Sequence, residues 1–255
     1  MTSDPSKTFA ELMSQTPFTP TPEEAGEEAR DEAEGGTLTR VACVTDRGVT
    51  PKYWSRMSCY EMSSFDLSAK PAALRRWKEL APPEASFIAR VDPQLALLGF
   101  KGPEAERLWG HALKRVEALG ATALLLNTPS TFRPSVEACA AIERFFKETP
   151  LPCPVAWRAD GLWEESDRYL EVCDAAGLMP VIDPLMWEEG AEMPEGERFY
   201  WRLLGGQGLT PRVTEYELER LLDLVEERGG DGWVVFSSPL MEPEAKRFSQ
   251  LLRGE

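Results

Sequence analysis

The chain contains very few residues of the types that build metal sites, disulfides or nucleophilic triads. It has one histidine, His111, and five scattered cysteines: Cys43, Cys59, Cys139, Cys153 and Cys173. The cysteine number is odd and no Cys-x-x-Cys pair occurs, which argues against a disulfide scaffold and against a structural zinc site. We therefore expect reduced cysteines that act as small core residues.

The usual motifs of catalysis and cofactor binding are also missing. The single histidine falls in the predicted helix 103–119, beside its apolar stripe, so neither a Ser-His-Asp triad nor a histidine-built metal site has credible members. The sequence has no Gly-x-Ser-x-Gly, no Walker-type loop and no Gly-x-Gly-x-x-Gly after a strand. We expect no metal and no cofactor.

Long apolar runs and positive charge are scarce as well. No stretch approaches the roughly 18 consecutive apolar residues of a membrane helix, and Met1–Lys7 lacks the apolar core of a signal peptide. We expect a cytoplasmic protein that does not bind membranes. The formal net charge of −15 argues against a nucleic-acid partner, because phosphate binding needs a basic stripe.

The negative charge is concentrated at the N-terminus. Residues 1–39 hold nine acidic and two basic side chains, and residues 14–36 are interrupted by proline and glycine. Such a segment buries too little apolar surface to offset its ordering entropy, which predicts a disordered acidic tail over 1–36 and one folded domain over 37–255. Phe9, Leu12 and Met13 fall at helical spacing within the tail. They form either a docking helix, for a partner or for the folded domain, or a frayed terminus without a role.

From Thr37 onward, short apolar runs alternate with amphipathic segments. The eight runs are 41–44, 60–65, 86–91, 122–127, 154–158, 178–182, 199–204 and 232–236. Strand–helix alternation repeated eight times in about 217 residues predicts a single (β/α)8 TIM-type barrel. A doubly wound open sheet is the alternative.

Several helix boundaries can be read from the sequence. The segments 103–119 and 215–226 carry regular apolar stripes, and Thr214 with Glu217 predicts a capping box before the second. Gly120 and Gly177 follow helical runs, as residues in left-handed conformation do. The connections after strands one and six look short or irregular, so we expect truncated helices there.

Barrels of this type carry their sites at the carboxyl ends of the strands. Three arginines, Arg90, Arg158 and Arg202, stand inside apolar strands, where an unpaired charge is costly. They are either guanidinium forks that bind a phosphate or carboxylate, or members of an internal ion-pair network with acidic residues of the strand ends. These acidic residues are Glu61, Asp160 and Asp183. Glu61 and Asp183 are also candidates for an acid–base pair.

Four segments resemble one known family in sequence and order. They are 124–129 (LLLNTP), 155–163 (VAWRADGLW), 200–205 (YWRLLG) and 233–238 (WVVFSS). They are similar to the YecE-like barrels, a family named only as a domain of unknown function, DUF72. The resemblance spans roughly Arg40 to Leu252. It implies a TIM-type barrel and no established reaction.

The resemblance also implies site residues, some of which this sequence retains. Retained are Glu61, Arg158, Trp163, Asp183 and Arg202, whereas Arg90 stands in place of a lysine, Asn127 of a glutamine, and Ser237 and Ser238 of paired asparagines. The family's strand-five glutamate is replaced here by Ala156, and its strand-seven histidine by Leu204. Glutamate and histidine are the groups best suited to proton transfer near neutral pH.

We therefore expect an eroded strand-end site in a barrel that does not catalyse a reaction. On this hypothesis it binds a protein partner, through the tail, or a small anionic ligand, through Arg90, Asn127, Arg158, Arg202, Ser237 and Ser238. The alternative is a hydrolase or sugar-phosphate isomerase-like enzyme that uses the carboxylates and arginines of the barrel mouth.

Overall fold

The computed structural model describes residues 38–44, 49–164, 166, 168–187, 192–205 and 211–255. The chain divides into two units, Met1–Gly36 and Thr37–Glu255, of which the second is described below. The predicted tail, with Phe9, Leu12 and Met13, lies outside the described residues.

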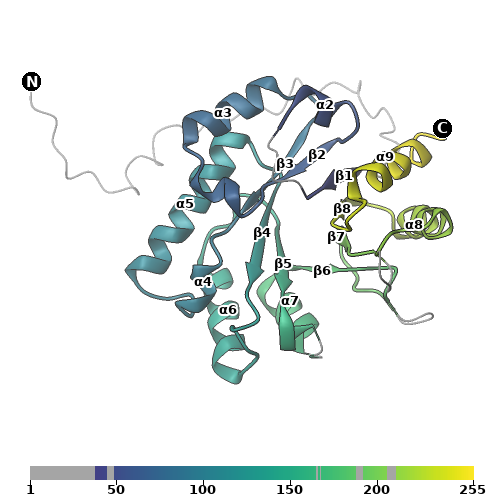
Figure 1. The fold of residues 1–255 in the computed structure, drawn as a ribbon. Coiled ribbons are helices and arrows are strands. Elements are labelled where there is room, and N and C mark those ends of the chain that lie inside the picture. The colour runs from purple at the N-terminus through teal and green to yellow at the C-terminus, as the bar shows by residue number, and fades with distance from the viewer. Residues whose placement is uncertain (1–37, 45–48, 165, 167, 188–191, 206–210) are drawn as a thin grey trace, which may run out of the picture. The chain divides into compact units, whose positions relative to one another are not determined.

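The second unit is built on eight parallel strands in the order β1-β8-β7-β6-β5-β4-β3-β2 (Figure 1). They are β1 (Thr39–Cys43), β2 (Cys59–Glu61), β3 (Ser86–Arg90), β4 (Ala123–Thr128), β5 (Val155–Ala159), β6 (Met179–Ile182), β7 (Arg198–Leu203) and β8 (Asp231–Phe236). Each of the eight apolar runs overlaps one of these strands, as predicted. β2 is shorter than expected, because the chain turns at Ser63, whose N–H donates to the Asp66 carboxylate, into the 3₁₀ helix η1 (Phe65–Ser68).

The sheet closes on itself almost completely. Strands β1 and β2 flank the one seam of the strand order, where the Ser58 N–H donates to the Val41 carbonyl at 3.2 Å. The Val41 N–H in turn donates to the Ser58 hydroxyl at 2.9 Å. The architecture is therefore a nearly closed (β/α)8 TIM barrel, as the sequence predicts.

Helices follow most strands and cover the outside of the sheet (Figure 1). They are α2 (Pro51–Trp54), α3 (Pro71–Leu80), α4 (Gln94–Leu97), α5 (Pro103–Leu119), α6 (Val136–Glu148), η2 (Gly161–Trp163), α7 (Arg168–Ala176), α8 (Glu215–Arg228) and α9 (Met241–Leu251). The truncation after β1 is confirmed, since α2 has four residues, and the described residues between β6 and β7 contain no helix. The capping box of Thr214 and Glu217 is present, and Gly120 and Gly177 both have positive φ.

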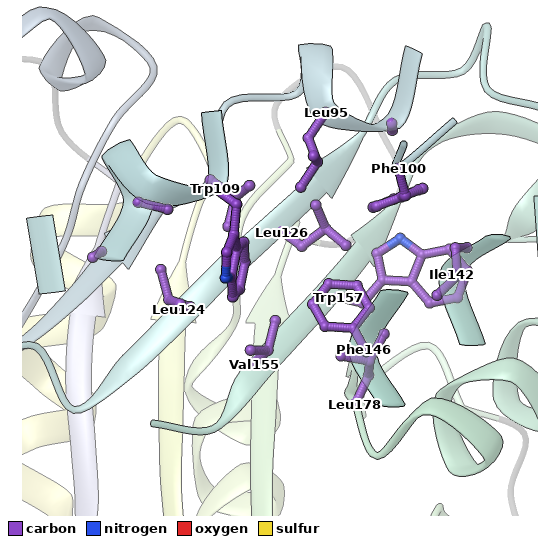
Figure 2. Packing of buried hydrophobic residues seen from close by; sticks show 14 of the residues in the cluster. Leu95, Phe100, Trp109, Leu124, Leu126, Ile142, Phe146, Val155, Trp157 and Leu178 are labelled. Atoms are coloured by element: carbon purple, nitrogen blue, oxygen red, sulfur yellow. The ribbon is translucent and has the colours of Figure 1, made fainter. Parts of the chain in front are cut away.

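The main core lies between the outer face of the sheet and the helices. In Figure 2, Leu124 and Leu126 of β4 and Val155 and Trp157 of β5 point toward the helices, where they meet residues such as Phe146 of α6. Trp157 is fully buried, and its indole N–H donates to the Thr128 hydroxyl at 3.0 Å. Because side chains alternate along a strand, the residues between these outward ones face the barrel interior.

A second apolar cluster fills that interior. Its members include Cys59, Ile88, Leu125, Ala156 and Tyr200, one from each of the strands β2, β3, β4, β5 and β7. Two residues further along each strand, the same face carries a polar or charged side chain. In strand order these are Glu61, Arg90, Asn127, Arg158 and Arg202. The alternation of the strands therefore brings the predicted site residues into one layer at the carboxyl end of the barrel.

Within the described part of the chain, no helix combines the length and apolarity needed to span a bilayer.

Candidate functional site

A fully buried ion pair forms the centre of the polar layer at the barrel mouth. Arg202 Nη1 donates to Glu61 Oε1 at 2.9 Å and to Oε2 at 2.7 Å, and the Tyr200 hydroxyl also donates to Oε2. Glu61 has no exposed surface, and the Arg202 side chain is 6% exposed. A buried carboxylate is tolerated when charge and hydrogen bonds both compensate its desolvation, and Glu61 has both.

The electrostatics of Glu61 follow from this arrangement. Burial raises the pKa of its carboxyl, but the charge and hydrogen bonds of Arg202, helped by Tyr200 and Arg90, outweigh burial and hold the pKa below its usual value. Burial, followed by the Glu61 charge, raises the pKa of Tyr200 well above the ordinary tyrosine value. Glu61 is thus a fixed anion and Tyr200 a fixed hydrogen-bond donor near neutral pH.

Arg90 lies in the field of the same pair but is bound to neither member. Burial lowers its pKa, the Glu61 charge opposes that effect, and the charges of Arg202 and Arg158 lower the pKa further. Among the described residues its guanidinium makes no hydrogen bond and no ion pair, and its buried Nε has no partner. Arg90 is therefore a partly buried cation, acted on by the charges of two other arginines and without an ion-pair partner among the described residues.

Arg158 forms a looser pair at the edge of the layer. Its Nη2 lies 3.2 Å from Asp160 Oδ1, and the two side chains are 28% and 32% exposed. Asn127, the register partner of Arg158 on β4, donates from Nδ2 to Asp160 Oδ2 at 3.3 Å, while its own buried Oδ1 accepts nothing among the described residues. Solvent reaches this pair, so Arg158 can exchange Asp160 for another anion at a small cost.

An open cavity lies beside these groups, above the ends of β5, β6 and β7. Its volume is about 450 Å³, and its wall includes Arg158, Tyr169, Asp183, Trp187, Arg202 and Leu204. The cavity thus has two of the three strand arginines in its wall and apolar surface around them, which is the usual composition of a small-molecule site.

Asp183 holds the backbone of the cavity wall. Its Oδ1 accepts the N–H of Leu185 at 3.1 Å, and its Oδ2 accepts the N–H of Leu204 at 3.0 Å. Burial raises its pKa, and these backbone hydrogen bonds oppose the rise. No ion pair joins Asp183 to an arginine among the described residues, so the internal network contains Glu61 and Asp160 but not Asp183.

The two serines after β8 are engaged within the protein. The Ser237 hydroxyl donates to the Leu203 carbonyl at 2.9 Å. The Ser238 hydroxyl donates to Glu244 of α9 and accepts the N–H of Leu240 at 3.1 Å. Ser237 thus joins the ends of β7 and β8, and Ser238 caps the start of α9.

The sequence interpretation missed one member of the site, Tyr200. Tyr200 lies two residues before Arg202 on β7, and side chains two residues apart on a strand share one face. This spacing could have identified it. At the positions where the family resemblance implies a glutamate and a histidine, Ala156 packs in the barrel interior and Leu204 lines the cavity. Among the described residues, no group of three or more His, Cys, Asp or Glu is arranged to hold a metal ion.

Comparisons with known proteins agree with this architecture. No family model and no curated protein matches the sequence. Among solved structures, a DUF72 family protein from Thermotoga maritima (TM1631) superposes with a TM-score of 0.64 at 16% identity, covering 85% of this chain and 99% of its own. A DUF72 family protein from Enterococcus faecalis (EF0366) also gives 0.64, at 14% identity, with 87% and 99% covered.

A more distant match is a fusion protein of a xylose isomerase-like TIM barrel and a 4-hydroxyphenylpyruvate dioxygenase. It has a TM-score of 0.56 at 11% identity and covers 84% of this chain and 42% of its own. At such identities the similarity shows the fold alone. At the level of the fold, it confirms the resemblance drawn from the sequence: the chain is a DUF72-like TIM barrel.

Proposed function

We propose that the barrel mouth binds a small ligand with a carboxylate or phosphate group. The observation that carries this proposal is the placement of Arg158 and Arg202 in the wall of the 450 Å³ cavity, with Arg90 partly buried in the same polar layer and without an ion-pair partner among the described residues. Guanidinium groups bind both kinds of anion through paired N–H donors.

The charge balance of the layer supports an anionic ligand. Arg202 is paired with Glu61 and Arg158 with Asp160, so the charge of Arg90 is left without an ion-pair partner among the described residues. Burial of a cation is costly where no anion pairs with it, and an incoming anion offsets that cost. The protein as a whole is strongly acidic, and Glu164 and Asp183 also line the cavity, so the unpaired charge of Arg90 is a local feature of the polar layer.

Unused hydrogen-bonding groups support the same proposal. The Nε atoms of Arg90 and Arg202 and the Oδ1 of Asn127 are buried without partners in the described structure. Native proteins satisfy nearly all such groups, and exceptions need a cause such as a missing ligand. Two donors and one acceptor suit a ligand that carries both an anionic group and a hydroxyl or amine.

The groups best placed for proton transfer already have partners. Both oxygens of Glu61 accept hydrogen bonds from Arg202 or Tyr200, and both oxygens of Asp183 accept backbone N–H groups. A general acid or base needs a free oxygen within reach of the substrate. We therefore favour binding without catalysis. The enzyme alternative keeps one supporting observation, which is the raised pKa of Asp183 in the cavity wall.

A thermal-shift screen with phosphorylated sugars, nucleotides and small carboxylates tests the proposal. A ligand at 100 times its Kd stabilises the native state by about 2.7 kcal/mol, which raises Tm by roughly 5–10 °C in a domain of this size. For a hit, Arg158→Gln is expected to weaken binding, because it removes a fork from the cavity wall.

Arg40→Gln is the matched control. Arg40 lies at the other end of the barrel, paired with Asp231 at 3.7 Å, and does not line the cavity. A flat response of the wild-type protein across the screen, or equal weakening by Arg40→Gln, would contradict the proposal.

A further inference from the structure

A second cavity lies on the outer side of the barrel wall, where η1 and the start of α3 meet α5. Its volume is about 350 Å³, and it is lined by the segment Leu67–Pro71, by Leu74, and by His111, Lys114 and Arg115 of α5. Three of these side chains are cationic and one is the only histidine of the chain, whereas none of the described lining residues is acidic.

Arg115 is the most informative member of this cavity. It is 8% exposed, and its Nη2 donates to the Leu67 carbonyl at 2.9 Å and its Nη1 to the Arg90 carbonyl at 3.4 Å. Among the described residues no carboxylate lies within ion-pairing distance of it. Two carbonyl oxygens use two of the five N–H donors and leave the guanidinium without an ion pair, which is costly in a buried position.

Two acidic side chains, Asp66 beside the lining segment and Asp92, which acts on Arg115 through its charge, have other hydrogen-bond partners. The Asp66 carboxylate accepts the N–H and hydroxyl of Ser63 and the hydroxyl of Tyr60. Asp92, which acts on Arg115 only through its charge, accepts the N–H of Gln94 at 2.9 Å. Neither carboxylate lines the cavity.

The start of α3 adds to the positive potential. This helix has ten residues, no acidic side chain in its first turn and no side-chain cap at Lys70. The amino end of a helix carries partial positive charge, which acidic residues usually balance. The first turn of α3 has no acidic residue to balance this charge, and Arg115 has no carboxylate in an ion pair among the described residues.

From the buried Arg115, which forms no ion pair among the described residues, and from the surrounding cations, we infer that this cavity is a binding site for the phosphate group of a small phosphorylated compound. Lys70 and Lys114 provide two exposed charges that suit a dianion, and Arg115 provides fixed N–H donors at the base. Leu67, Ala69 and Leu74 form an apolar wall for the organic part of the ligand. This site is separate from the cavity at the barrel mouth, with which it shares no lining residue.

The single histidine makes the inference testable without resonance assignment. His111 lines the cavity, so its ring Cε1–H gives one proton NMR signal that reports on occupancy of this site alone. Inorganic phosphate and pyrophosphate are titrated into the full chain at constant ionic strength and pH. We expect a saturable change in the chemical shift of this signal, with pyrophosphate binding more tightly and a Kd in the millimolar range or below.

Charge reversal at the exposed lysines identifies the site. Lys114→Glu and Lys70→Glu are each expected to weaken pyrophosphate binding by about tenfold or more, because each turns an attraction into a repulsion at close range. Both side chains are exposed, so these variants are expected to fold even if replacement of Arg115 does not. Lys246→Glu, an equal change of charge at an exposed position of α9, is the control and should leave the Kd unchanged.

A non-saturable shift in the wild-type protein, or equal weakening by Lys114→Glu and Lys246→Glu, would overturn the inference. The Arg158→Gln variant separates this result from the proposed function. It is expected to lose ligand binding at the mouth and to keep the His111 response to pyrophosphate.

Discussion

Replacing either member of the buried ion pair at the barrel mouth is predicted to have unequal effects on stability. Glu61 and Arg202 compensate one another, and Arg90 adds a further positive charge within the field of Glu61. Glu61→Gln therefore leaves the buried Arg202 and the partly buried Arg90 without an anion. Arg202→Met leaves Glu61 with Arg90 as a remaining counter-charge and with the Tyr200 hydroxyl as a hydrogen-bond donor.

The magnitudes follow from the burial of the pair. Removing one partner of a buried ion pair costs about 3–5 kcal/mol. We place Glu61→Gln in that range, since it doubles the uncompensated charge of the cluster. Arg202→Met is expected to cost less, about 1–3 kcal/mol, because the cluster of Glu61, Arg90 and residue 202 becomes neutral and the methionine fills most of the space.

Urea denaturation of the two variants, read through the midpoint at constant m-value, measures the difference. A phosphate or carboxylate in the buffer should restore more stability to Glu61→Gln than to the wild-type protein, since an anion can take the place of the lost charge. Two results would refute the charge balance on which the proposed function rests. One is that Arg202→Met destabilises the protein as much as Glu61→Gln does, and the other is that Glu61→Gln costs less than about 1 kcal/mol.

The pH dependence of stability provides a second check on Glu61. Its pKa in the folded protein is held below the usual value of 4.5, so its contribution is present above pH 4.5 and is lost as the pH falls through the folded pKa. The wild-type protein should therefore lose its stability advantage over Glu61→Gln on acidification below pH 4.5. An advantage that stays constant in that window would contradict the lowered pKa.

Three further predictions concern single side chains. The pKa of Asp183 is raised from 3.8, so its contribution to stability is lost as the pH rises through the folded pKa. Between pH 4 and pH 7, the urea midpoint of the wild-type protein should therefore fall relative to that of Asp183→Asn. A change in the opposite direction would contradict the raised pKa. Thr214→Ala removes the hydroxyl of the capping box of α8 and should cost about 1 kcal/mol in urea denaturation, whereas Thr131→Ala, at an exposed turn position, should cost almost nothing. Trp157→Ala empties the centre of the outer core and should lower stability by about 3–5 kcal/mol, and a loss under 1 kcal/mol would show that the core collapses around the gap.

Much of the barrel could be predicted from sequence because its signals are local. Apolar runs of strand length and helical stripes such as that of α5 depend on neighbours in the chain, and the capping box of Thr214 and Glu217 spans three residues. The end of β2 was predicted wrongly, because the strand is cut short by the Asp66 carboxylate binding the Ser63 N–H, and an apolar run does not reveal such a turn.

The candidate site could be predicted only in part. Strand position alone indicated that Glu61, Arg90, Arg158 and Arg202 lie at the carboxyl end of the barrel, since each follows an apolar strand residue by two positions. The choice between ligand forks and internal ion pairs stayed open, because Glu61 and Arg202 are 141 positions apart in the chain.

By itself, the sequence determined the eight-fold strand–helix repeat, the caps of its best helices and the excess of negative charge, because each depends on composition or on residues a few positions apart. Only the tertiary structure decided which charges compensate one another. Closure of the sheet buries Glu61 against Arg202 and leaves Arg90 unpaired among the described residues, and packing of α5 buries Arg115 without an acidic partner there. Ion pairing depends on distances that the sequence does not contain, and it is on those distances that both proposed anion sites rest.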